Sequence, residues 1–210
     1  MKSVERGVFI VFEGIDGSGK TTQLEKARAF LAERGREVVV TREPGGTAIG
    51  EKIRGLLLDT ANGDMCDGCE LLLYAASRAQ HVAEIIAPAL AEGKAVLCDR
   101  FGLSTAAYQG YGRGLDLERI AAVHRAAAGG VEPDLTLVID VPAEVGAERV
   151  GGRRGEGKDR LEREEIEFFE RVRRGYLTEA EGDGTVAVID GRGDADGIFD
   201  AVRAALEAVL

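Results

Sequence analysis

Short apolar runs alternate with longer amphipathic stretches along the whole chain. The run at residues 8–12 is continuously apolar, as expected of a strand that is buried on both faces of a sheet. Four further runs of this kind occur at residues 37–41, 95–98, 135–139 and 186–189. The pattern therefore predicts five short strands, and their continuous apolar character favours parallel pairing.

Between these runs, apolar residues recur with the spacing of a helix. Residues 23–34 place Leu24, Ala27 and Leu31 on one face, and Gly35 follows as a stop signal. The other predicted helices are one that carries Arg54, residues 70–92 with a kink at Pro88, and residues 117–128, 142–150, 162–180 and 195–209. Strand and helix alternate five times.

This alternation predicts an α/β fold with a five-stranded parallel sheet and helices on both faces. No repeat, low-complexity linker or composition break divides the chain, so we expect one domain over residues 1–210. Ligands of such folds bind beyond the C-terminal ends of the strands. The expected site therefore lies just after Phe12, Thr41, Cys98 and Ile139.

Composition agrees with a globular domain. The chain has 210 residues, 45% of them hydrophobic and 30% charged, and its mean hydropathy is −0.08. These values exclude a disordered tail, a fibre and a membrane bundle. The first apolar run is too short for the core of a signal peptide, and no small-residue cleavage site follows it. We expect a cytoplasmic protein with no membrane partner.

The net charge of the chain narrows the classes of molecule that it can bind. The net charge of −10 disfavours a broad nucleic-acid surface, which requires a basic face. An acidic protein can still bind a small anion where a few arginines converge in one cleft. Cys66 and Cys69 form a C-x-x-C, but Cys98, His81 and His124 show no ligand spacing with it, so we interpret these two cysteines as ordinary loop residues.

The strongest motif follows the first predicted strand. Its sequence is G-x-x-x-x-G-K-T between a strand and a helix, which is the context that a phosphate-binding P-loop requires. It comprises Gly14, Ile15, Asp16, Gly17, Ser18, Gly19, Lys20 and Thr21, with Thr22 next to it. Backbone N–H groups of such a loop curl around phosphate oxygens at a helix N-terminus. Lys20 can reach the β and γ phosphates, and the Thr21 hydroxyl can bind Mg²⁺.

The P-loop predicts nucleoside triphosphate binding without saying which reaction follows. A GTPase would need an N-K-x-D motif, and the single asparagine, Asn62, is followed by glycine. The chain length and the arginines near strand ends favour a small-molecule kinase. Two alternatives remain: a nucleotide-binding switch or scaffold, and a deoxynucleoside kinase. Arginines suited to a substrate phosphate argue against both.

The second and third predicted strands end in charged residues. Thr41 is followed by Arg42 and Glu43, and the third strand ends at Asp99 and Arg100. An acid at a strand tip beside a P-loop is placed to hold Mg²⁺ through water, and the arginine can hold a phosphate. The alternative is an ordinary ion pair at the sheet edge.

Six segments, in this order, resemble bacterial thymidylate kinases and cover the chain almost end to end. They are F-E-G-I-D-G-S-G-K-T-T at 12–22, T-R-E-P-G-G at 41–46, Y-A-A-S-R at 74–78, D-R-F at 99–101, S-T-A-A-Y-Q-G at 104–110 and P-D-L-T at 133–136. The resemblance implies a P-loop nucleotide kinase fold that transfers the γ-phosphate of ATP to dTMP. It also implies Mg²⁺ as cofactor and a homodimer.

Carried over residue by residue, the resemblance implies a dTMP site. Arg54 and Arg100 would hold the substrate phosphate, while Arg78 and Gln109 would read the edge of thymine. Tyr74 stands where the family usually has a stacking phenylalanine, and Phe101 replaces a frequent tyrosine. The remaining residues implied are Tyr108 against the sugar 2′ position, Asp16 near the 3′-hydroxyl or the metal, and Glu43 and Ser104 in support.

A glycine- and charge-rich segment at about 149–160 resembles the short lid that closes over ATP. Positions 15–18 carry no basic residue, which the resemblance associates with arginines in the lid. Arg149, Arg153 or Arg154 is therefore expected to meet the transferring phosphate, and Arg149 is also expected to bind ATP. The alternative is a solvated loop whose arginines face water.

Overall fold

Five parallel strands form one sheet in the order β2-β3-β1-β4-β5, as the alternating pattern predicts. The computed structural model describes residues 6–152 and 159–210. The strands are β1 (Phe9–Glu13), β2 (Val38–Arg42), β3 (Ala95–Asp99), β4 (Leu135–Asp140) and β5 (Val186–Asp190). Because β1 lies between β3 and β4, the loop that follows β1 reaches the centre of the sheet edge where ligands of this fold bind.

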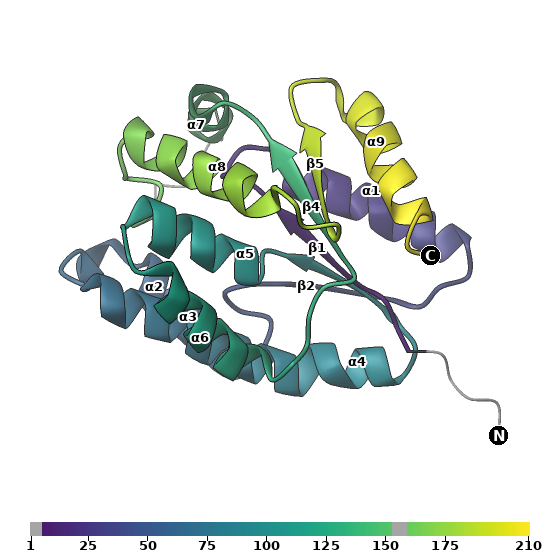
Figure 1. Cartoon of the computed structure of the whole chain (residues 1–210), viewed down its shortest axis with the longest axis horizontal. Helices are drawn as coiled ribbons and strands as arrows, with labels where there is room; N and C mark the ends of the chain where they lie inside the picture. The colour runs from purple at the N-terminus through teal and green to yellow at the C-terminus, as the bar shows by residue number, and fades with distance from the viewer. Residues whose placement is uncertain (1–5, 153–158) are drawn as a thin grey trace.

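Helices cover both faces of the sheet (Figure 1). Helices α1 and α9 pack on one face, and α3, α4 and α6 lie on the other. The elements are α1 (Lys20–Glu33), α2 (Ala48–Leu58), η1 (Thr60–Asn62), α3 (Asp67–His81), η2 (Val82–Ile86), α4 (Ala87–Ala91), α5 (Gly102–Thr105), η3 (Ala106–Gly112), α6 (Leu117–Ala128), α7 (Ala143–Gly151), α8 (Ile166–Ala180) and α9 (Ala195–Glu207). Within the described ranges, no helix has both the length and the apolar character needed to cross a membrane.

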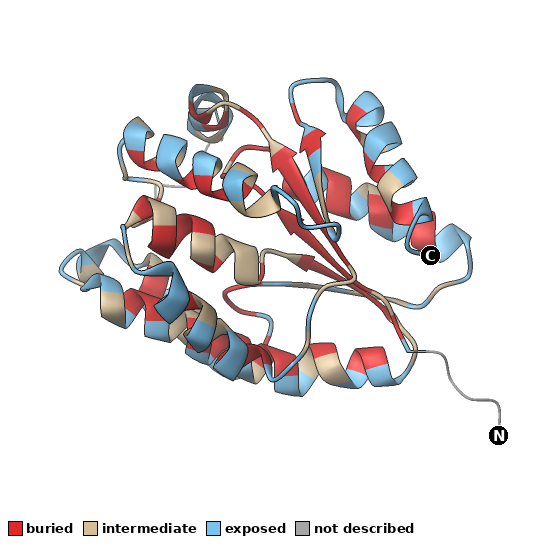
Figure 2. Ribbon diagram, in the orientation of Figure 1, coloured by how far each residue is buried: buried red, intermediate tan, exposed pale blue. Residues whose placement is uncertain are grey.

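Cores on both sides of the sheet explain the continuous apolar runs of β1, β3 and β4, whereas β2 and β5 were also expected to be buried on both faces but lie at the sheet edges and are only partly buried. Ile10 and Phe12 of β1 pack with α1 and α9. The alternate residues Phe9 and Val11 pack with residues of η2 and α4 and with Phe101. Successive side chains of a strand point to opposite faces, so a strand covered on both sides needs apolar residues at every position. Figure 2 shows this burial along the central strands.

Two predicted helices and the interpretation of the cysteines differ from the structure. The stretch at 70–92 is not one α-helix with a kink at Pro88, because a π-helical segment, η2, separates α3 from α4. Pro88 has no N–H to donate, so the turn before it loses an ordinary helical hydrogen bond. Helix α8 begins at Ile166, four residues later than residue 162, because Asp159 accepts from the N–H groups of Leu161 and Glu162 and holds them in a turn.

The third difference concerns the cysteines. Cys66 is the N-cap of α3 and Cys69 lies in its first turn, so they are not loop residues. Both are exposed and free. The helical turns α5 and η3, which carry S-T-A-A-Y-Q-G, were also not among the predicted elements.

The burial of the strands predicts how much a cavity in the core would destabilise the protein. Val96 of β3 is fully buried, whereas Val188 of β5 is 46% exposed. Val96→Ala should lower the free energy of unfolding by about 2 kcal/mol, since each buried methylene contributes about 0.8 kcal/mol and a cavity remains. Val188→Ala, the matched control, should lower it by less than about 1 kcal/mol. Urea unfolding of both variants checks this, and equal losses would contradict the assignment of β3 to the core.

Candidate active site

The P-loop leaves the end of β1 and leads into α1. Gly14, Gly17 and Gly19 have positive φ values of 131°, 78° and 99°, which residues with a Cβ rarely adopt. A Cβ on Gly14 would lie 2.4 Å from the carbonyl oxygen of Ile139, so the neighbouring strand also requires glycine there. The loop can turn tightly between the strand and the N-terminus of α1, where its N–H groups suit an anion.

Lys20 is the first residue of α1 and is buried. Its Nζ donates to the carbonyl oxygen of Ile15 at 3.0 Å, so the side chain folds back over its own loop. Burial, together with the nearby Arg100, lowers the pKa of Lys20, and the carboxylates of Asp99 and Asp16 oppose this. The ammonium is held where a phosphate on the loop would meet it.

Thr21 and Asp99 form an oxygen pair beside the P-loop. The Thr21 hydroxyl donates to Oδ2 of Asp99 at 3.4 Å. The other carboxylate oxygen, Oδ1, is buried and has no hydrogen-bond partner among residues 6–152 and 159–210. Hydroxyl and carboxylate oxygens suit Mg²⁺, which keeps several of its waters, so these two residues fit a magnesium ion held partly through water.

Arg100 follows β3 in an unusual backbone conformation. Its φ of 74° lies in the left-handed region, which costs a non-glycine residue about 1–3 kcal/mol. Its N–H donates to the carbonyl of Phe12 at 2.9 Å, and its Nη2 donates to Asp16 at 2.8 Å and to Tyr108 at 3.1 Å. These bonds hold the guanidinium at the junction between the P-loop and the neighbouring cleft.

A buried carboxylate supports the turn after Arg100. Oε1 of Glu13 accepts from the N–H groups of Phe101 and Ser104 at 2.8 and 3.1 Å. Oε2 accepts from the hydroxyls of Ser104 and Tyr176 at 2.5 and 3.0 Å. The tyrosine hydroxyl in turn accepts from Arg100 at 2.9 Å. Our sequence reasoning missed Glu13 and Tyr176, although a charged residue at the end of an apolar strand was a usable signal for Glu13.

Asp16 is the P-loop residue that faces Arg100. Burial by itself raises the pKa of Asp16, but the charges of Arg100 and Lys20 and the hydrogen bonds from Arg100 and Tyr108 lower it to about 2. The carboxyl therefore remains ionised at neutral pH, and it links the phosphate loop to the adjacent cleft.

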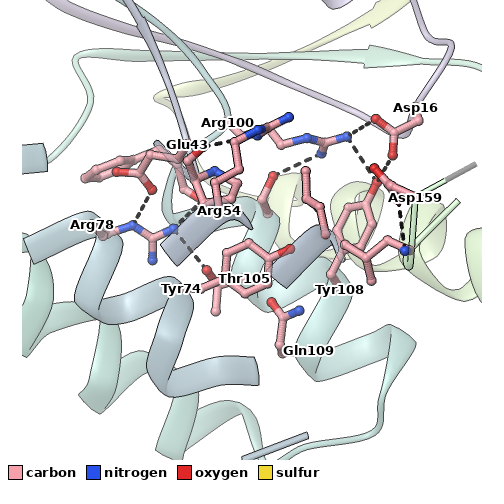
Figure 3. Close-up of a pocket in the computed structure, with 15 residues that line it drawn as sticks. Asp16, Glu43, Arg54, Tyr74, Arg78, Arg100, Thr105, Tyr108, Gln109 and Asp159 are labelled. Carbon is pink, nitrogen blue, oxygen red and sulfur yellow. Dashed lines mark hydrogen bonds and ion pairs between the residues drawn. The ribbon is translucent and has the colours of Figure 1, made fainter. Parts of the chain in front are cut away.

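The adjacent cleft is drawn in Figure 3. It is lined by every residue that the sequence predicted for dTMP: Glu43, Arg54, Tyr74, Arg78, Arg100, Ser104, Tyr108 and Gln109. A second pocket covers the P-loop, and the two share Asp16, Glu43, Arg54 and Arg100. Arg54 comes from α2, and its Nη1 donates to the carbonyl of Pro44 at 3.1 Å. The peptide bond before Pro44, Glu43–Pro44, is cis. Two cavities therefore meet at a pair of arginines.

Comparison with known proteins agrees with this arrangement. The family model for thymidylate kinase matches residues 12–200. The curated thymidylate kinase of Geobacter sulfurreducens is 53% identical over 209 residues, 97% of each chain. Those of Pelotomaculum thermopropionicum and Desulforudis audaxviator are 58% and 52% identical, over 82% and 97% of this chain and 79% and 92% of their own. The chain belongs to the thymidylate kinase family.

In this thymidylate kinase family member, Arg78 is held more tightly than the sequence suggested. Its Nε donates to Glu43 at 2.8 Å, and its Nη2 donates to Phe101 O and Thr105 Oγ1 at 2.9 and 3.0 Å. His81, which is fully buried, lies 3.0 Å from the other oxygen of Glu43. Glu43 therefore orients Arg78 from behind. The sequence analysis had assigned Glu43 only an unspecified supporting role in the dTMP site.

The residues expected over ATP are described in part. The guanidinium of Arg149 donates to backbone carbonyls of Gly17, Ser18 and Gly191 at 3.3, 3.5 and 3.2 Å, so it contacts the back of the P-loop. Helix α7 ends at Gly151. Arg153 and Arg154, and with them half of the expected lid, lie outside the described residues.

Glu70 is another residue of the site that sequence reasoning missed. It is buried in α3 and accepts hydrogen bonds from Gln109, Arg113 and Arg160. Its spacing was a usable signal: Glu70, Tyr74 and Arg78 recur every four residues and so share one helix face.

The low pKa of Asp16 predicts a pH-dependent contribution to stability. A carboxyl whose pKa falls from 3.8 to about 2 on folding stabilises the protein above pH 4, and this contribution fades as the pH falls towards 2. Asp16→Asn should therefore lower the free energy of unfolding at pH 6, and the deficit should shrink between pH 4 and pH 3. Urea unfolding of both proteins at these pH values checks this. A deficit that is constant with pH would contradict the pairing of Asp16 with Arg100.

Proposed function

We propose that this protein transfers the γ-phosphate of ATP to dTMP, forming dTDP and ADP. The observation that carries the proposal is the shared wall of the two pockets, where Arg54 and Arg100 stand between the P-loop and the adjacent cleft. A nucleotide switch has no use for a second anion site. A deoxynucleoside kinase would need a base for a neutral hydroxyl, whereas these side chains suit a substrate that already carries a phosphate.

The acceptor needs no deprotonation by the protein. The second pKa of a phosphate monoester is near 6, so a dTMP oxygen is already anionic at neutral pH. That oxygen attacks the γ-phosphorus, and the bond to the ADP oxygen breaks. The work of the protein is to hold two anions in line against their repulsion. Arg54 and Arg100 would bind the acceptor phosphate, and Lys20 would bind the transferring one.

Thr21 and Asp99 would hold the Mg²⁺ that accompanies ATP. When bound, such an ion neutralises charge on the β and γ phosphates. The unpartnered Oδ1 of Asp99 and the Thr21 hydroxyl support this part of the proposal. Arg149 would stabilise the P-loop around ATP, and Arg153 and Arg154 remain the proposed lid arginines.

The rest of the cleft suits a thymidine nucleoside. Tyr74 offers an aromatic face for the base, and Tyr108 would crowd a 2′-hydroxyl. Arg78 has one guanidinium nitrogen, Nη1, whose nearest partner is Nδ1 of His124 at 3.4 Å. It would donate to a carbonyl of thymine.

The proposal extends to the setting of the enzyme. We propose a single domain over 1–210 that acts in the cytoplasm, where its nucleotide substrates are, as a homodimer through α3. Exposed apolar side chains on α2 and α3 support such an interface: Ile49, Leu56 and Leu72 are each at least half exposed. ATP and dTMP are its proposed substrates, with no nucleic-acid or membrane partner.

Replacing the P-loop lysine tests the ATP site. Lys20→Ala should lower kcat about 10³-fold or more while the protein remains folded, because Lys20 stabilises charge on the transferring group. Lys26→Ala is the matched control on the same helix, since Lys26 pairs with Asp196 away from the pockets. A coupled assay for ADP with ATP and dTMP checks both. If Lys20→Ala retains most of its turnover, the assignment of Lys20 is wrong.

Base preference tests the dTMP site. Thymine and uracil differ by one methyl group, so dUMP should be poorer than dTMP by about 10–200-fold in kcat/KM. Cytosine presents an amino group where thymine has a carbonyl, so dCMP should be worse by about 10⁴-fold. Arg78→Ala should compress the gap between dTMP and dCMP, while Tyr74→Phe should leave the order unchanged.

The ratio of kcat/KM for two substrates is measured on one preparation of each variant, so it does not depend on how much of that variant folds. This matters for Arg78→Ala, which leaves Glu43 without its arginine. Wild-type protein that uses dCMP as well as dUMP would contradict the role given to Arg78.

A further inference from the structure

One end of the Gln109 side chain is fixed by a buried carboxylate outside the phosphate machinery. Nε2 of Gln109 donates to Oε1 of Glu70 at 2.9 Å, and both residues are 1% exposed. Among residues 6–152 and 159–210, no hydrogen bond reaches the amide oxygen of Gln109. That oxygen belongs to a residue that lines the cleft, and Figure 3 draws it on the side of the amide towards Tyr74.

The orientation of this amide follows from the charge of Glu70. An ionised carboxylate can only accept hydrogen bonds, so the amide must turn its NH₂ group towards it and its oxygen away. The reverse orientation would place two acceptors against each other and leave the NH₂ group facing the cleft.

The surroundings of Glu70 keep it ionised. Arg113 donates to both carboxylate oxygens at 3.3 Å, and Arg160 also donates to Oε2. Burial alone would raise the pKa of Glu70, but the hydrogen bonds from Gln109, Arg113 and Arg160 lower it below its ordinary value. Two cations thus hold the charge that fixes the amide.

With Arg78 as the donor of the proposed function, the cleft would present that donor and an acceptor from Gln109. Thymine carries a carbonyl acceptor next to the N3–H donor, which is the complementary pair. Cytosine carries an amino donor next to a bare N3 acceptor, which is the inverse. A fixed acceptor on Gln109 rejects cytosine, whereas an amide that could rotate would offer cytosine the NH₂ group it needs.

We propose that Glu70 is a positioning residue for base selection, which locks the Gln109 amide so that its oxygen accepts the N3–H of thymine and excludes cytosine. This inference rests on the proposed function. Glu70 itself contacts no substrate in this account and acts only through Gln109.

Glu70→Gln tests the proposal, because an amide at this position can present either a donor or an acceptor and no longer fixes its neighbour. The ratio of kcat/KM for dTMP to that for dCMP should fall by about 10-fold or more relative to wild type. A residue that only stabilised the fold would lower both values together and leave the ratio unchanged. An unchanged ratio in Glu70→Gln therefore overturns the proposal.

Glu164→Gln is the matched control. Glu164 accepts from Nη1 of Arg113 at 2.6 Å, so it belongs to the same ionic cluster without touching Gln109. Its ratio should stay within about 3-fold of wild type, below the 10-fold change that marks one lost hydrogen-bond preference. A fall equal to that of Glu70→Gln would overturn the proposal, since it would assign the effect to the cluster as a whole.

A double-mutant cycle tests whether Glu70 acts through Gln109. Gln109→Leu removes the acceptor and should compress the same ratio. In the Gln109→Leu background, Glu70→Gln should change the ratio no further, whereas independent effects would multiply and overturn the proposal. If Glu70→Gln does not fold, Glu70→Gln combined with Arg160→Gln replaces it, because this pair removes one buried charge of each sign.

The wild-type assay separates this inference from the proposed function. Wild-type protein that does not phosphorylate dTMP contradicts the proposed function. Wild-type protein that selects dTMP over dCMP, with an unchanged ratio in Glu70→Gln, contradicts only the role of Glu70.

Discussion

The strained backbone of Arg100 is the constraint on which the site depends. Its positive φ turns the chain at the end of β3 and places the guanidinium between two pockets. The cost of about 1–3 kcal/mol is offset by bonds from both sides: Glu13 fixes the following turn, and Asp16 and Tyr176 hold the guanidinium. Because Asp16 lies in the P-loop, the same bonds set the distance between the two anion sites.

The electrostatics explain how an acidic chain can offer a site to two anions. With a net charge of −10, the surface as a whole repels nucleotides. The cleft reverses this locally, because arginines from α2, from α3 and from the turn after β3 converge on it while their carboxylate partners lie behind or beside them. Glu43 behind Arg78 is the clearest case. The pair is buried, and Nη1 of Arg78 lies near His124 instead of Glu43. The local charge of the cleft therefore depends on where each charged side chain is buried and in which direction it points, and the net charge of the chain does not reveal this.

Sequence reasoning succeeded where the signal is local. The five strands follow from apolar runs at every position, and the P-loop follows from glycine spacing at one strand end. It failed where the geometry depends on particular hydrogen bonds and not on periodicity. The π-helical turns η2 and η3 and the delayed start of α8 are of this kind. Glu13 and Glu70 left local signals that were not used, but the hydrogen-bond partners that define them, and that of His81, lie 35 or more positions away.

The two halves of the proposed site are built from different kinds of element. This separates the residues proposed for phosphoryl transfer from those proposed for base selection. Apart from Arg54 of α2, the residues proposed for the phosphates stand at the ends of β1 and β3, which are buried central strands with fixed register. Residues for the base stand on α3 and on the π-helical turn η3, which is the kind of widened turn often found at functional sites. A substitution on the helix face of Glu70, Tyr74 and Arg78 can therefore alter which base fits without moving Lys20 or Arg100. In the proposed function, the phosphate geometry is shared by every nucleotide that enters, and the orientation of a few buried polar groups selects the base.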